Sequence, residues 1–236
     1  MGAALGNLSG LGLFLISDVP GFFLTKGRMI LKRNLEKFEQ KLENIPPDQI
    51  LPMRPEIGVP TLQKLTYVED EDISSMFVNL LANASDKRSR DIAHPSFVHC
   101  ISTMSSDEAQ ILLHLYKSEV MVIPFSVIRC QFNENEGIAK SDMLTGLEQE
   151  LDLIFSDNIP IYIANLTGLG ILEREISFLS DEKKYYEPLY QKYEGRRQEL
   201  FKEGHGGKQF PMIFVKGYYS VTPYGKLFIQ SCVKGI

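Results

Sequence analysis

The chain has 236 residues, of which 44% are hydrophobic and 23% charged, and its formal net charge is −5. This length accommodates one or two domains, and the negative net charge gives no general attraction for nucleic acid. Cys100, Cys130 and Cys232 lie far apart without a C-x-x-C spacing, which favours a reducing cytoplasm and argues against a disulfide framework or a zinc ribbon.

Residues 2–25 form an apolar, glycine-rich segment with Asp18 as its single charge. A secretory signal peptide needs a positive start, and no basic residue precedes Lys26. A membrane-spanning helix needs about 20 mostly apolar residues, but Asp18, Pro20 and inner glycines oppose insertion. We therefore expect this segment to be buried against the domain or another subunit. The alternative is contact with a membrane surface, aided by the basic residues between 26 and 33.

The distribution of apolar residues and prolines divides the chain into modules. Helical spacing of apolar residues predicts a helix over 29–42, at the end of a first module of residues 1–45. Five prolines between residues 46 and 60 predict a connecting arm. Residues 61–118 then form a helical module, and residues 119–236 form a carboxyl-terminal module.

One predicted helix of the central module carries a polar stripe. Apolar side chains recur at i, i+3, i+4 and i+7 over residues 73–84, and four acidic residues (69–72) stand in the opening turn. The stripe, at steps of three and four, consists of Asp72, Ser75, Asn79 and Asn83. Because asparagine is a poor helix former, two on one line indicate hydrogen bonds, either to a neighbouring loop of the chain or to an interaction partner.

His94 follows a short charged link, and we add it to this candidate interaction site. As a general base or metal ligand it would need a second group, and no H-E-x-x-H or E-x-x-H spacing supplies one. A structural role beside Pro95, which suits the first position of a helix, is favoured.

Several segments follow one another in a fixed order. The acidic cluster precedes Asn79-Leu80-Leu81-Ala82-Asn83-Ala84, then His94-Pro95-Ser96-Phe97-Val98, then Met104-Ser105-Ser106-Asp107-Glu108-Ala109. This string resembles the bacterial abortive infection alpha (Abi-alpha) family. The resemblance is strongest over residues 50–116 and continues more weakly to Leu169-Gly170 and Thr222-Pro223. It implies a role in phage defence but supplies no known chemistry.

The carboxyl-terminal module changes from helical to alternating patterns. The predicted elements are a strand or short helix over 120–132, helices over 143–154 and 160–169, strands over 172–179 and 211–221, and a last helix from Thr222-Pro223. Helix, helix, strand, strand, helix resembles a winged helix. The predicted fold class is mainly α, with an N-terminal helical module followed by a winged-helix-like α/β module that contains a small antiparallel β-hairpin.

An insert of residues 180–209 interrupts the predicted hairpin and combines basic with aromatic side chains. Its candidate interface residues are Lys184, Tyr185, Tyr190, Arg196 and Arg197. Such a surface serves nucleic acid or a protein interface, and we favour the protein interface. The second helix of a winged helix reads the major groove of DNA, but here it offers base edges only Asn165 and Thr167 and no positive charge.

The sequence contains neither G-x-S-x-G nor a kinase motif set, and we predict no catalytic site, metal or cofactor. The predicted function is antiphage defence in the bacterial cytoplasm through a protein partner or self-association, with a peripheral position at the inner membrane as a variant. Two alternatives stay open: a membrane-acting effector that uses residues 2–33, and a DNA-binding regulator that uses the carboxyl-terminal module.

Overall fold

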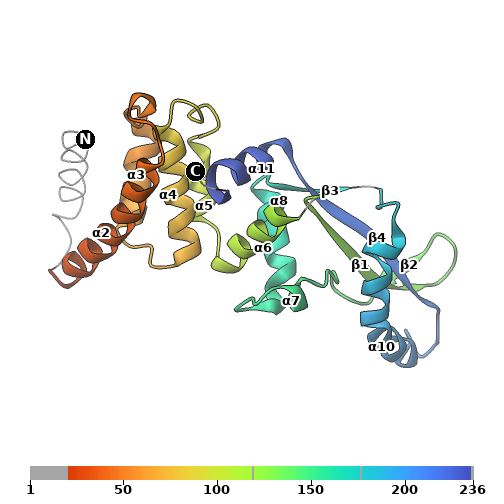
Figure 1. Ribbon diagram of the computed structural model, residues 1–236. Helices are drawn as coiled ribbons and strands as arrows, with labels where there is room; N and C mark the ends of the chain where they lie inside the picture. Colours follow the sequence, from red (N-terminus) through yellow and green to blue (C-terminus); the bar gives the residue numbers. More distant parts are fainter. Residues whose placement is uncertain (1–20, 119, 176, 235–236) are drawn as a thin grey trace. The chain divides into compact units, whose positions relative to one another are not determined.

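The computed structural model describes residues 21–118, 120–175 and 177–234. Its helices and strands carry the labels of Figure 1, which begin at α2. The chain divides into two compact units: the first runs to Tyr116 and includes the residues from Pro223 onward, and the second is Lys117–Thr222. The predictions for the apolar segment of residues 2–25 mostly concern residues 2–20, which lie outside the described residues; the structure describes this segment from residue 21 onward.

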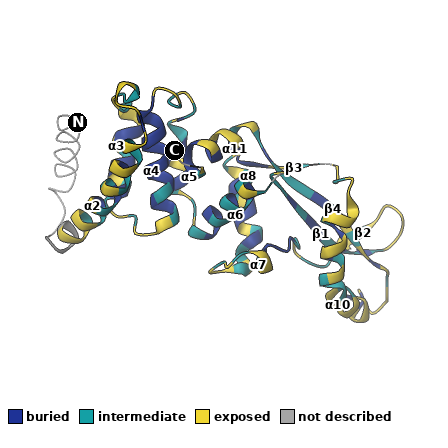
Figure 2. Cartoon of the chain, in the orientation of Figure 1, coloured by how far each residue is buried: buried dark blue, intermediate teal, exposed yellow. Residues whose placement is uncertain are grey.

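The first unit is built from helices. Its elements are α2 (Gly21–Glu43), the short 3-10 helix η1 (Pro47–Gln49), α3 (Pro55–Leu65), α4 (Glu71–Ser85), α5 (Ser96–Ser102), α6 (Ser106–Lys117), α11 (Pro223–Phe228) and the π-helix η3 (Ile229–Val233). Helix α4 is central, because it contacts α2, α3, α5 and η3. All its residues from Met76 to Ser85 are buried, whereas α2 exposes one side (Figure 2).

The acidic cluster before α4 joins this helix to α2. Asp70 caps α4 by accepting a hydrogen bond from the backbone N–H of Ile73 at 2.9 Å. Glu71 forms ion pairs with Arg33, at 3.1 Å, and with Lys37. The hydrogen bond from Lys37 is the main cause that lowers the pKa of Glu71. Because these ion pairs are exposed, they orient α2 on α4 more than they stabilise the unit.

Helix α3 begins inside the segment that its prolines predicted as an arm. Pro55 occupies the first helical turn, where a missing backbone N–H costs no intrahelical hydrogen bond. Pro60 lies within the same helix. The apolar residues Ile57, Leu62 and Leu65 are then buried in the core of the first unit. The prolines therefore mark the start of a helix as well as a connection.

The second unit contains a four-stranded antiparallel sheet with the strand order β2-β1-β4-β3. Its strands are β1 (Val122–Gln131), β2 (Gly137–Ala139), β3 (Leu172–Glu175) and β4 (Met212–Val221). Its helices are α7 (Leu147–Glu150), η2 (Ser156–Asn158), α8 (Ile159–Gly168), α9 (Glu182–Tyr185) and α10 (Glu187–Glu203). The long β1 and β4 pair from Val122 opposite Ser220 to Cys130 opposite Met212.

Strand β1 tolerates Pro124 because the proline nitrogen points away from β4, toward a side where no described strand pairs with this part of β1. The N–H of Ser126 points away from β4 and donates to the carbonyl of Leu144 at 2.9 Å. Pro124 is two residues earlier, so its nitrogen faces the same side. The neighbour on that side, β2, pairs only with residues 129–131 of β1. Pro124 therefore removes no hydrogen bond from the sheet.

The predicted helix over residues 143–154 is wrong. Leu144 instead exchanges two backbone hydrogen bonds with Ser126 of β1, and Gly146 has a left-handed φ of 84°. The single short helix in this stretch is α7. Leu144 is partly buried and packs against a cluster that includes Ile128 and Met212. Leu147 is buried and Leu144 is partly buried, and the helical spacing of the leucines does not produce a helix over 143–154.

The mainly helical class is confirmed, and the two predicted hairpin strands pair with each other. Leu172 lies opposite Val221, and Glu175 lies opposite Tyr218. The sheet is larger than the predicted hairpin, because β1 occupies the other edge of β4 and β2 extends it. The winged-helix assignment is not confirmed by this four-stranded arrangement.

The insert between the hairpin strands covers the sheet with α10. Tyr186 is fully buried and donates from its hydroxyl to the carbonyl of Gly217 at 3.1 Å. Farther along α10, Leu200 is buried against the apolar cluster of β1 and β4. Helix α10, through Leu189 and Leu200, forms part of the core of the second unit.

Replacing Gly217 with alanine should lower the free energy of unfolding by about 1–3 kcal/mol, the usual cost of overpacking a core. A Cβ at this position would lie 2.5 Å from Cζ of Phe125. The ring has little room to move, because it is 2% exposed and the Arg174 guanidinium lies 5.0 Å from its centroid. Urea titration followed by circular dichroism measures the change.

The matched control is Gly195→Ala in α10, where an added Cβ meets nothing within 4 Å. Alanine in a helix interior is more stable than glycine by roughly 0.5–1 kcal/mol, so this variant should be at least as stable as the parent. Equal stability of the Gly217 and Gly195 variants would contradict the packing of Phe125 described above.

Candidate functional site on helix α4

The two asparagines of the polar stripe hold the residues of η3. Asn79 donates from Nδ2 to the carbonyl oxygen of Cys232 at 2.8 Å, and Asn83 donates to that of Ser231 at 2.9 Å. Asn83 also donates to the carbonyl oxygen of Asn79 at 3.1 Å. Both side chains are buried. We call these two asparagines and the two carbonyl groups that they bind the asparagine clasp.

The clasp explains why asparagine stands in the middle of α4. Carbonyl groups at the end of a helix have no partner within it, and both Ser231 and Cys232 are fully buried against α4. A buried carbonyl without a hydrogen bond costs about 1–3 kcal/mol. Asparagine carries two N–H donors on a short side chain, and its low helix propensity costs at most about 0.7 kcal/mol per residue. The hydrogen bonds therefore outweigh the propensity.

The other residues of the predicted interaction site lie differently. Asp72 bonds to Gln110, and burial together with two neighbouring carboxylates raises its pKa. Ser75 is half-buried and lines a cavity. His94 makes its contacts at the start of α5. The stripe thus combines an internal clasp with part of a cavity wall, and its role as a partner surface stays a prediction.

His94 begins a chain of polar contacts that the sequence did not indicate. Its Nδ1 lies 2.6 Å from Oγ of Ser96, and that oxygen lies 2.7 Å from the hydroxyl of Tyr224 on α11. The same hydroxyl lies 3.3 Å from Sγ of Cys100. The contact between Ser96 and Tyr224 joins residues 128 positions apart, which periodicity within one segment does not reveal.

The pKa shifts of the residues in these polar contacts favour a structural role for them. Burial raises the pKa of Tyr224 to about 12, and it also raises the pKa of the Cys100 thiol. Both groups are therefore protonated at neutral pH, whereas a catalytic nucleophile or base needs a pKa near the working pH. Phe97 packs edge-on against Tyr224, with ring centroids 5.3 Å apart. The contacts join α5 to α11.

A cavity of about 420 Å³ lies beside the clasp in the first unit. Besides Ser75 and Asn79, its polar lining residues are Lys37, Gln40, Lys41, Asn44 and Lys234. Three of them are cationic, and α2 contributes Lys37, Gln40 and Lys41. The combination of ammonium and carboxamide groups suits an anionic or strongly polar ligand.

Neither a metal centre nor a membrane span is found in the described part of the chain. Over these residues, His, Cys, Asp and Glu side chains do not gather in the groups of three or more that would hold a metal ion. No helix among them is both long enough and apolar enough to cross a membrane. Cys100, Cys130 and Cys232 are buried thiols.

Part of the basic and aromatic interface predicted in the insert faces the sheet. Tyr190 stacks on Phe214 of β4 with ring centroids 4.7 Å apart. Arg197 donates to the carbonyl of Met212 at 2.9 Å and forms an ion pair with Glu194. Hydrogen bonds, chiefly from Arg197, lower the pKa of Glu194 to about 2. These groups therefore fix α10 on its own sheet.

The rest of that predicted interface faces outward. Lys184 and Arg196 are exposed, and the Lys184 ammonium lies 5.1 Å from the ring centroid of Tyr185. Arg196 forms an ion pair with Glu199 at 3.2 Å. The exposed surface of α9 and α10 thus contains both signs of charge, and its role as an interface stays a prediction.

Comparison with known proteins assigns the chain to a family. The family model described as abortive infection alpha matches residues 29–232, a span that contains α4, the asparagine clasp and the whole second unit. The chain belongs to the abortive infection alpha family. The family resemblance predicted from the ordered segments between residues 50 and 116 is thereby confirmed.

Other comparisons add little to the Abi-alpha assignment. No curated protein matches the chain. A solved structure of an uncharacterized protein from the hydrocarbon-degrading marine bacterium Alcanivorax borkumensis SK2 is similar, with 12% sequence identity and a TM-score of 0.35. The similarity covers 63% of this chain and 96% of that chain. At this TM-score it carries no argument about fold or function.

Replacing Asn83 with alanine should lower the free energy of unfolding by about 1–3 kcal/mol, because the buried carbonyl of Ser231 loses its donor. Hydrogen exchange of residues 229–234 should accelerate more than that of β1. Mass spectrometry of the exchanging protein measures both regions. Ser75→Ala, on the same stripe but half-exposed, is the control and should change stability by less than about 0.5 kcal/mol. Unchanged exchange in Asn83→Ala would show that the clasp does not hold η3.

Proposed function

We propose that this Abi-alpha protein protects bacteria from phage by abortive infection and acts through contact with a protein, either a partner or a second copy of itself. The family match supports the defence role. The observation that carries the interaction is a group of exposed apolar side chains in the second unit.

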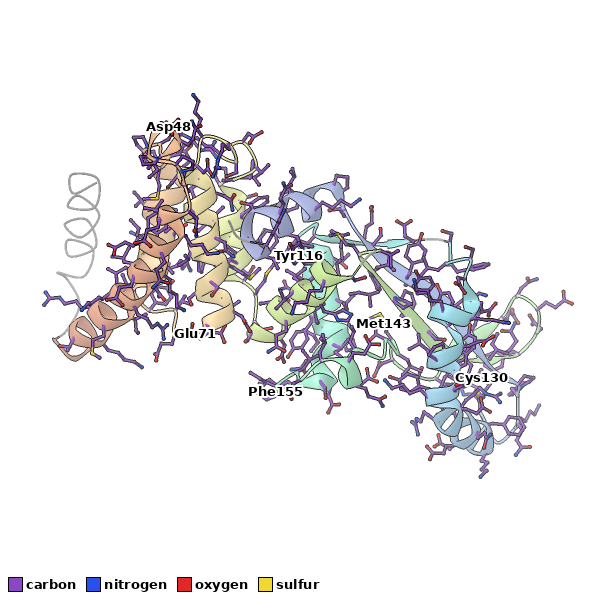
Figure 3. All side chains as sticks on the ribbon, in the orientation of Figure 1. Asp48, Glu71, Tyr116, Cys130, Met143 and Phe155 are labelled. Carbon is purple, nitrogen blue, oxygen red and sulfur yellow. The ribbon has the colours of Figure 1, made fainter. Side chains whose placement is uncertain are left out.

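The apolar group, which we call the 154–161 patch, surrounds η2 and the start of α8. Ile154, Phe155 and Ile161 are 65%, 63% and 64% exposed, respectively, and Phe155 is labelled in Figure 3. Single exposed apolar residues are ordinary, but several in one short segment are typical of a protein-binding surface. Aromatic residues such as Phe155 are also enriched in interfaces.

The carboxyl-terminal module offers less support for direct DNA reading. Helix α8, the second helix of the predicted winged helix, exposes Ile161 and carries no basic residue. DNA-binding proteins rely on Arg and Lys contacts with phosphate groups. An apolar exposed face on α8 is better suited to a protein than to a polyanion.

The double variant Phe155→Ser and Ile161→Ser should remove protection against phage and leave the melting temperature within a few degrees of the parent, because both side chains are exposed. Plaque counts and survival of infected cultures measure protection, and circular dichroism measures melting. The control is Met29→Ser on α2, which is 69% exposed but lies in the other unit. Full protection by the folded double variant would rule out the patch as the interaction surface.

The location of the protein in the cell distinguishes a membrane-acting mechanism from the protein-contact mechanism. Deleting residues 2–25 should leave the protein in the same cell fraction as the intact chain and leave protection unchanged if the 154–161 patch carries the function. Fractionation of infected cells with phage challenge of both versions tests this. Loss of both membrane location and protection on deletion would replace the protein-contact mechanism by a membrane effector.

A further inference from the structure

The cavity beside the asparagine clasp concentrates positive charge in a protein whose net charge is −5. Its three cations come from two places: Lys37 and Lys41 lie one turn apart on α2, and Lys234 follows η3. Among the residues that the structure describes, those that line the cavity carry no carboxylate. Lys37 also forms an ion pair with Glu71 at the start of α4.

The lining also supplies neutral hydrogen-bonding groups. Gln40 lies on α2, Asn44 directly follows that helix and Ser75 lies on α4, and each can donate to an oxygen. Ammonium groups beside carboxamide and hydroxyl donors are the chemistry with which proteins bind phosphate groups. A volume of about 420 Å³ lies within the usual range of small-molecule sites, roughly 300–1,000 Å³.

Asn79 belongs to both the clasp and the cavity wall. Its Nδ2 donates to Cys232, which fixes the orientation of the amide, and its Oδ1 is buried without a hydrogen-bond partner among the described residues. A buried acceptor left unpaired is destabilising by about 1–3 kcal/mol, and native structures contain few of them. Such a group at a binding site is consistent with a side chain held for position and not for stability.

We propose that this cavity binds a small phosphorylated molecule, and that the bound molecule links α2 to the segment that carries Lys234. The clasp sets the geometry, because its bonds to Ser231 and Cys232 hold η3, and Lys234, which lines the cavity together with Lys41, follows two residues after Cys232. Asn79 and Asn83 are thus positioning residues for the site. This inference is independent of the role in defence, since binding is measured on the purified protein.

The test is calorimetric titration of the full chain with ATP, inorganic tripolyphosphate and adenosine as probes. Saturable binding of ATP and tripolyphosphate is expected if the phosphate groups suffice, and binding of ATP alone if the nucleoside also makes contacts. Either result supports the site. Absence of saturable binding by both phosphate probes, or equal binding of adenosine, would overturn it.

Two lysine variants locate the bound molecule. Lys41→Gln and Lys234→Gln should each weaken binding about tenfold, the effect of losing one charge-assisted hydrogen bond. Lys32→Gln is the matched control: it removes the same charge from the same helix, but the Lys32 side chain is 80% exposed and does not line the cavity. Equal weakening in all three variants would indicate attraction by net charge alone and would contradict the site.

A second readout separates positioning from charge. Asn83→Ala keeps every lysine of the cavity, yet it should weaken ATP or tripolyphosphate binding because Lys234 is no longer held in place. In the parent, a bound phosphate probe should slow hydrogen exchange over residues 229–234, and Lys41→Gln should reduce this protection. Unaltered exchange on saturation with the probe would show that the ligand does not link the two elements.

Discussion

The hydrogen bonds from two asparagines to two buried carbonyl groups organise the first unit. They connect positions 148 and 153 residues apart and hold η3 against the most buried helix of the protein. Without these donors, the close packing of η3 on α4 would leave buried carbonyl groups unpaired, which is why apolar packing alone could not replace them. The clasp thus sets the positions of both Lys234 and α11, and through α11 the position of Tyr224 next to α5.

The two units carry different kinds of candidate surface. Polar and cationic groups gather in the first unit, at the cavity beside α4. The 154–161 patch, by contrast, belongs to the second unit, where basic and aromatic residues of the insert are largely used to fix α10 on its sheet. In this member of the abortive infection alpha family, the surface proposed for protein contact and the cavity proposed for a small anion therefore belong to different units. Neither requires an activated nucleophile.

Elements with a strong local signal were predictable from the sequence, whereas long-range partners were not. The period of α4, the capping box in which Ser105 and Glu108 exchange hydrogen bonds, and the proline at the start of α11 all depend on neighbours within one turn. The stripe of Asn79 and Asn83 showed that hydrogen bonds were needed but could not show that Ser231 and Cys232 accept them. The helix predicted around Leu144 was wrong for the converse reason: its apolar spacing is that of a helix, but Leu144 pairs with Ser126 of β1 and packs against the cluster around Ile128.

The division of the chain also has a consequence for its synthesis. The second unit lies between two parts of the first in the sequence, so that residues 117–222 are synthesised before η3. Before Ser231 and Cys232 are synthesised, Asn79 and Asn83 of α4 lack the two η3 carbonyl groups to which they donate. Contacts of such sequence separation form slowly. The four strands of the sheet all lie within residues 117–222, so the sheet can form from contacts within its own unit, whereas the helical unit is complete only once η3 has joined it.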